Sequence, residues 1–95
     1  SRKFGDLDVW GYVFNSEEVE WILIRDYEKD LMYEGWVGAF SATVKDGELF
    51  LRDVIVYRIS DGTELYRLDG MYITLNRDRK DVIIEIRELS ERGGV

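Results

Sequence analysis

Two Asp-Gly turn signals constrain the fold of this chain more than any other feature of its sequence. "KDG" at 45–47 and "SDG" at 60–62 each lie between runs that are rich in β-branched and aromatic residues. Asp-Gly between such runs is the usual sequence signature of a β-hairpin. Two hairpins in series predict an antiparallel meander, in which each strand pairs with its neighbour in the chain.

Short apolar runs separated by polar turns supply the strands of this meander. Gly35 and Gly38 lie inside one run and suit a strand that bends sharply or carries a bulge. Sharp bends of this kind are typical of small barrels. We expect strands at 19–25, 31–40, 48–58, 63–68, 70–75 and 81–89.

The central run, 48–58, has an apolar alternation that Arg52 and Asp53 interrupt. We expect the strand to bend at these two residues, and we assign its side chains to two faces by counting alternate positions. One predicted face holds Leu49, Leu51, Ile55 and Tyr57, and the other holds Phe50, Val54 and Val56.

The two ends of the chain differ from this β-rich middle. Leu7, Trp10 and Phe14 recur at helical spacing after an acidic start, which predicts a short helix or turn at 6–14. Residues 90–95 are polar and Gly-rich and are expected to form a flexible tail. The 95 residues fit one small domain. The predicted fold class is all-β: a small, strongly bent, five- to six-stranded antiparallel barrel at 19–89 with a short N-terminal helix.

The composition excludes several classes of functional site. The chain has no Cys and no His, so it lacks a thiolate metal site, a cysteine nucleophile and the usual neutral-pH proton shuttle. Its net charge of -7, from 13 basic and 20 acidic residues, repels a phosphate backbone. We therefore predict a non-enzymatic protein without a cofactor or a metal, and we expect it not to bind nucleic acid.

Pairs of carboxylates are the remaining feature of the sequence that could support an enzymatic activity. Such a pair could support acid-base chemistry if burial raised one pKa, but we expect these acids in solvated loops or at a helix N-terminus. The order of acids at 26–30 and 76–81 does not match a calcium loop. The pairs are Asp6 with Asp8, Glu17 with Glu18, and Asp78 with Asp81.

Two stretches of the chain resemble the motifs of the Sm-like, or more broadly SH3-like, small barrels. "EGWVGAF" followed by "ELFLRDV" is similar to the first Sm motif, which has a Gly, an apolar residue two further on, an aromatic and then a strand ending in an acid. "LDGMYI" is similar to the second motif of apolar, Arg, Gly, two variable residues and an apolar residue. The resemblance implies an Sm-like or SH3-like barrel.

The residues that the Sm resemblance would assign to RNA binding are absent here. The family has an Asp after the aromatic of the first motif, whereas Phe40 is followed by Ser41. The Arg of the second motif is replaced by Asp69, before Gly70. Because Asp repels phosphate and cannot stack on a base as Arg does, we interpret these positions as a degenerate RNA site. The open alternative is that Asp69 and Gly70 form a tight turn, with Gly at positive φ.

A second resemblance covers nearly the whole chain. "DVWGYVF", "VEWILIR", "GWVGAFS", "ELFLRDVIVY" and "DVIIEI" in this order are similar to an uncharacterised family of soluble domains that follow N-terminal transmembrane helices. The loop "DYEKD" departs from the shorter Asp-Gly turn of that family. The resemblance implies a cytoplasmic domain that contacts the membrane only through an upstream anchor. The chain starts at Ser1 without an initiator Met, so we expect it to be a fragment.

Aromatic side chains give the best prediction of a binding surface. Trp and Tyr are enriched in the energetically dominant residues of interfaces, so we expect some of them to form an exposed groove for a protein or peptide partner. The preferred function is an interaction or scaffolding module, and the alternative is an Sm-like RNA-binding protein with a degenerate site. No oligomeric state is predicted. The candidate partner-binding residues are Tyr33, Trp36, Tyr57, Tyr66 and Tyr72.

Overall fold

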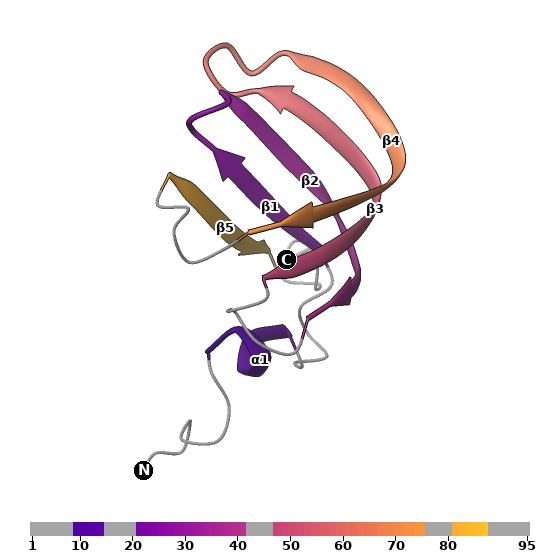
Figure 1. The fold of residues 1–95 in the computed structure, drawn as a ribbon. Coiled ribbons are helices and arrows are strands. Elements are labelled where there is room, and N and C mark those ends of the chain that lie inside the picture. The colour runs from indigo at the N-terminus through magenta and orange to yellow at the C-terminus, as the bar shows by residue number, and fades with distance from the viewer. Residues whose placement is uncertain (1–8, 15–20, 42–46, 76–80, 88–95) are drawn as a thin grey trace, which may run out of the picture.

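The computed structural model of the chain describes residues 9–14, 21–41, 47–75 and 81–87. Within these residues the chain forms one antiparallel sheet of five strands in the order β4-β3-β2-β1-β5 (Figure 1). The elements are α1 (Val9–Phe14), β1 (Trp21–Asp26), β2 (Leu31–Phe40), β3 (Glu48–Arg58), β4 (Glu64–Thr74) and β5 (Val82–Arg87).

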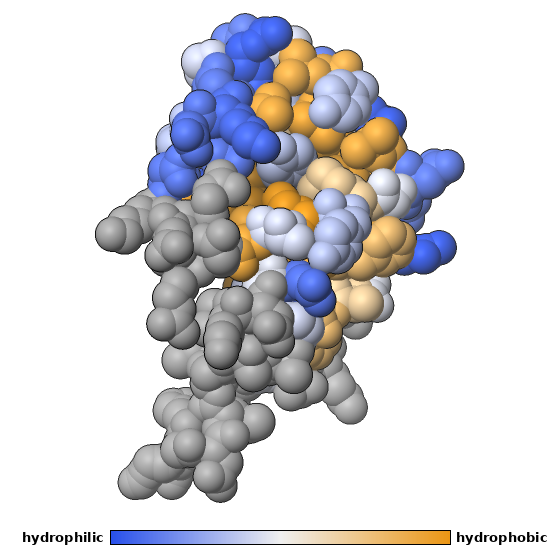
Figure 2. All heavy atoms as spheres, in the orientation of Figure 1, coloured by the Kyte–Doolittle hydropathy of each residue, from blue (hydrophilic) through white to orange (hydrophobic). Residues whose placement is uncertain are grey.

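The sheet confirms the predicted all-β class but is open in the described residues. Sequential strands β1 to β4 pair with their neighbours, and β5 returns to pair with β1. The outer strands are therefore β4 and β5. Figure 2 shows apolar side chains gathering on the surface between these two edges. No helix of the described residues is long and apolar enough to cross a membrane.

The β3–β4 turn is built as the "SDG" signal predicts. Gly62 has a φ of 74°, a left-handed conformation that glycine adopts without strain. The N–H of Arg58 donates to the carbonyl of Thr63 at 2.8 Å, and the N–H of Gly62 donates to the carbonyl of Arg58 at 2.8 Å. The Asp61 carboxylate accepts the N–H of Thr63 at 3.0 Å. These bonds fix the register of the two longest strands.

The prediction of separate strands at 63–68 and 70–75 is wrong, because β4 runs continuously through Asp69 and Gly70. Gly70 pairs with Arg52 in the ladder and is not among the glycines at positive φ, so the tight-turn alternative is wrong as well. A Cβ at Gly70 would lie 2.9 Å from Cζ of Phe50. An alanine at this position would require the Phe50 ring of the neighbouring strand to shift.

The predicted division of the β3 side chains is wrong beyond the bend. Leu51 and Val54 are both fully buried in the same core, although strict alternation would place them on opposite faces. The cause is a bulge: Trp36 pairs with Arg52 and Glu34 pairs with Ile55, so β3 uses one more residue than β2 over this interval. The extra residue moves Val54 and Val56 to the face of Leu49 and Leu51.

The hydrophobic core lies on one face of the curved sheet, and α1 lies at one end of it (Figure 1). Trp10 and Phe14 extend the core from α1, with their ring centroids 4.8 Å apart. The indole N–H of Trp10 donates to the carbonyl of Ser41 at 2.8 Å and joins the helix to the end of β2. The sheet residues that are fully buried in this core are Ile22, Ile24, Leu49, Leu51, Val54 and Val56.

Candidate functional site

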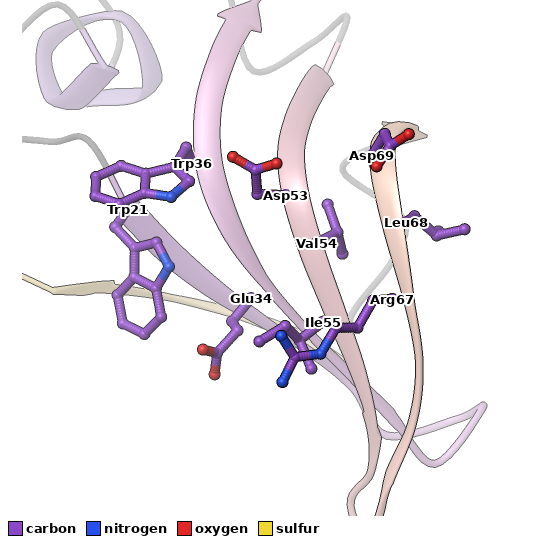
Figure 3. A pocket seen from close by; sticks show the side chains of 9 residues that line it. All are labelled: Trp21, Glu34, Trp36, Asp53, Val54, Ile55, Arg67, Leu68 and Asp69. Atoms are coloured by element: carbon purple, nitrogen blue, oxygen red, sulfur yellow. The ribbon is translucent and has the colours of Figure 1, made fainter.

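A cleft of about 380 Å³ crosses the face of the sheet that lies opposite the core. Strands β1 to β4 all contribute to it (Figure 3). Trp21 precedes the buried Ile22 and Trp36 follows the buried Gly35, so both tryptophans project from the outer face. The residues that line the cleft are Trp21, Glu34, Trp36, Asp53, Val54, Ile55, Arg67, Leu68 and Asp69.

One wall of the cleft is aromatic. Trp21 and Trp36 are directly opposite each other in the β1–β2 ladder, and Figure 3 shows their indoles next to one another. Directly opposed residues have Cβ atoms roughly 5 Å apart, so the two indoles form one apolar surface. Trp36 keeps 40% of its surface exposed. A large aromatic surface that stays open to solvent is characteristic of ligand and partner sites.

The other walls carry three carboxylates, which belong to Glu34, Asp53 and Asp69. Asp53 and Asp69 occupy opposed positions on β3 and β4, because the pairs on either side of them are in register. Like charges placed opposite each other in a sheet are destabilising. Asp53 also has a φ of 54°, which is uncommon for a residue with a side chain. The sheet therefore holds two acids at opposed, electrostatically unfavourable positions in the cleft, and Asp53 lies beside Trp36 (Figure 3).

Among the described residues, Arg67 is the one cation that lines the cleft, and a carboxylate outside the cleft binds it. Its Nε donates to Oε2 of Glu64 at 2.7 Å, and its terminal nitrogen donates to Oε1 at 3.2 Å. This paired hydrogen bond raises the pKa of Arg67 and lowers the pKa of Glu64. The charge of Arg67 is thus largely compensated locally, and the three carboxylates leave the cleft acidic.

The predicted partner-binding residues do not form a single site. Trp36 lies in the cleft. Tyr57 lies close by, where burial first and then the neighbouring Glu34 raise the pKa of its phenol. Tyr66 and Tyr72 are 50% and 62% exposed on the edge strand β4. Tyr33 is only 8% exposed and belongs to the hydrophobic core, so it contributes nothing to the surface.

The four positions that match the Sm motifs are split between two places. Phe40 packs on Phe14 of α1 with ring centroids 5.4 Å apart. The hydroxyl of Ser41 accepts the N–H of Glu48 at 3.0 Å, and the carbonyl of Ser41 accepts the indole N–H of Trp10. Phe40 and Ser41 therefore contribute to the junction of helix and sheet. Asp69 lines the cleft, whereas Gly70 lies against the ring of Phe50. Only Asp69 of the four belongs to the candidate site.

A second acidic group lies at the β1–β2 turn. Carboxylate oxygens of Asp26, Glu28 and Asp81 all lie within 4.8 Å of one another, a spacing that could hold a cation. Asp26 is buried, and it accepts the N–H of Lys29 at 3.2 Å, so its carboxylate stabilises the turn. This group was not among the predicted acid pairs, each of which includes at least one of residues 6, 8, 17, 18 and 78, which lie outside the described residues.

Sequence reasoning missed most of the residues of the cleft. Trp21, Glu34, Asp53 and Arg67 were not predicted as site residues. The one available signal was the break in alternation at Arg52 and Asp53, which marks the bulge beside the tryptophans. In comparisons with known proteins, neither a protein-family model nor a curated protein matches this chain.

Proposed function

We propose that this protein is a non-enzymatic interaction module that binds an extended peptide segment of a protein partner along strand β4. The observation that carries this proposal is the exposure of large apolar side chains on an outer strand. Tyr66, Leu68 and Tyr72 are 50%, 37% and 62% exposed on β4. A long edge strand with such side chains is an unusual risk for a soluble protein unless a partner covers it.

The chemistry of an edge strand supports a peptide as the ligand. The outer side of β4 offers backbone N–H and C=O groups to an added strand, because β3 occupies only its inner side in the described sheet. Main-chain hydrogen bonds would supply affinity, and the side chains of alternate residues would supply specificity. Tyrosines contribute large contact areas at low entropic cost.

The alternative of an Sm-like RNA-binding protein has weaker support. The position where the Sm resemblance expects an Arg holds Asp69, which lines a cleft together with Glu34 and Asp53. A phosphate backbone would approach three carboxylates there, in a protein whose net charge is -7. The peptide proposal has no such electrostatic cost.

We also propose that the domain has the fold of a small barrel of the Sm-like or SH3-like type. Its support is the strand order, in which a meander is followed by a last strand that pairs with the first, together with the bulge that bends β3. The placement of the domain on the cytoplasmic side of a membrane, behind an upstream anchor, rests on the sequence resemblance. An apolar run of about 20 residues upstream in the full gene would support that placement.

The function can be tested by selecting ligands from a displayed library of random peptides and measuring their affinity by calorimetry. We expect selected peptides to lose at least about tenfold in affinity when alternate backbone amides are N-methylated, because strand addition needs those N–H groups. Tyr66→Ala should weaken binding, whereas Ile83→Ala on the other edge strand, β5, should not. If N-methylation has no effect, or if Ile83→Ala weakens binding as much as Tyr66→Ala, strand addition at β4 is wrong.

A further inference from the structure

We infer that the cleft on the outer face of the sheet is a binding site for an organic cation, the ammonium or guanidinium group of a Lys or Arg side chain in the bound peptide. The inference rests on the proposed peptide binding and names the chemistry that the peptide would carry. It is based on the two tryptophans and three carboxylates that line the cleft and on the position of the cleft next to β4.

The aromatic wall suits the apolar and the charged parts of such a side chain. The face of an indole ring attracts a cation within about 6 Å, and Trp is the strongest of the aromatic residues in this respect. The methylene stem of Lys or Arg packs well on apolar surface while its head group stays polar. Trp21 and Trp36, side by side in Figure 3, offer both kinds of contact.

The carboxylates supply the charge complementarity. Glu34 lies below the two indoles and Asp53 lies beside Trp36, so a cation on the rings would have acids on two sides (Figure 3). Asp53 and Asp69 occupy opposed positions in the β3–β4 ladder, where like charges are unfavourable, and a bound cation in the cleft would offset that cost. An anion gains none of these interactions, since Arg67 is already bound to Glu64.

The cleft lies next to the strand, β4, along which the peptide is proposed to bind. Successive side chains of a strand point to opposite faces of its sheet, and β4 contributes Arg67, Leu68 and Asp69 to the lining of the cleft. The side chains of an added strand would alternate in the same way, so every second one would project on the face that carries the cleft. A basic residue at one of these alternate positions could reach across β4 to the carboxylates.

The test uses small probes and the tryptophan side chains as reporters. The ¹⁵N-labelled protein would be titrated with Nα-acetyl-lysine amide and Nα-acetyl-arginine amide, and with Nα,Nε-diacetyl-lysine amide as the neutral control. We expect the indole N–H signals of Trp21 and Trp36 to shift with both cations and not with the neutral probe. The indole of Trp10, which is buried and bonded to Ser41, is the internal control and should not move.

Matched variants separate the cleft from the general negative charge. Replacing both Asp53 and Asp69 with Asn should weaken cation binding about fivefold, as expected for two partly exposed ion pairs. Asp61→Asn, at an exposed acid in the β3–β4 turn, should change it less than twofold. An equal effect of the two changes, an equal response to the neutral probe, or unmoved indoles with both cations would overturn the inference.

The outcomes also separate this inference from the proposed function. If library peptides shift the β4 amides and neither cation moves the indoles, the cation site is wrong and peptide binding at β4 stands. If the cations bind in the cleft and no library peptide binds β4, the proposed function fails while the small-cation site remains.

Discussion

At the scale of single residues, Asp53 is the residue within the described strands whose φ is positive. Its φ of 54° lies in the left-handed region, which Asp and Asn tolerate and β-branched residues do not. We predict that Asp53→Val destabilises the protein by about 1–2 kcal/mol relative to Asp53→Asn. Chemical denaturation of the two variants measures the difference, and equal stabilities would contradict the bulge geometry.

Gly35 gives a second prediction at this scale. An added Cβ would lie 3.0 Å from the carbonyl oxygen of Arg52, which is part of the backbone, and 3.1 Å from a methyl group of the fully buried Val54. Gly35→Ala should therefore destabilise the protein by about 1–3 kcal/mol, the usual cost of overpacking.

Gly70→Ala is the matched control for that change. Its Cβ would approach the far end of the Phe50 side chain, which can shift more readily than the backbone carbonyl beside Gly35. We expect it to change the free energy of unfolding by less than about 1 kcal/mol, since alanine also favours a strand over glycine. The account of these glycines fails if thermal denaturation ranks the two variants in the opposite order.

At the scale of elements, the β3–β4 hairpin should weaken in acid. Hydrogen bonds from Thr63 and then Arg58 lower the pKa of Asp61 in the folded state. Because the folded pKa lies below the unfolded value, the stabilisation is complete above the ordinary pKa of Asp and is lost as the pH falls through the lowered value.

Amide hydrogen exchange across the turn, measured as a function of pH, tests this prediction. Protection of the Thr63 amide, corrected for the intrinsic pH dependence of exchange, should fall in acid in the native protein. In Asp61→Asn, which cannot ionise, the corrected protection should stay constant over the same range. A parallel fall in both proteins would assign the effect to other groups.

The attachment of α1 to the sheet depends on Trp10. Its indole is 7% exposed and donates to the carbonyl of Ser41, so Trp10→Phe keeps much of the packing and removes the bond. We predict a loss of about 0.5–1.5 kcal/mol of stability, the usual net contribution of one hydrogen bond. Urea denaturation measures this loss, and an unchanged midpoint would show that the bond does not stabilise the helix–sheet junction.

At the scale of the whole molecule, the predictable part of the fold was the part set by local sequence. The bounds of β2 and β3 follow from apolar runs and turn residues, and the structure reproduces both at 31–40 and 48–58. The faces of β3 beyond Asp53 were predicted wrongly, because a bulge depends on how β3 pairs with β2. The role of Gly70 was also predicted wrongly, because the contact that limits a side chain there comes from the Phe50 ring on the neighbouring strand.

The candidate site was less predictable for the same physical reason. Trp21, Glu34, Asp53 and Asp69 come from four strands, and only the registers of three ladders bring them to one cleft. Sequence alone does not fix those registers. Trp36 and Asp69 were singled out individually, but nothing in the sequence indicated that they line the same surface.

The central claim is that β4 and the neighbouring cleft bind peptide and not nucleic acid. The most direct measurement is to titrate the ¹⁵N-labelled protein, at physiological salt, with a selected library peptide and separately with single-stranded oligouridine. The account predicts that the peptide shifts the backbone amides of 66–72 and the indoles of Trp21 and Trp36, while the RNA shifts none of them. Shifts of the same signals by RNA, or a peptide that perturbs only residues outside β4 and the cleft, would contradict it.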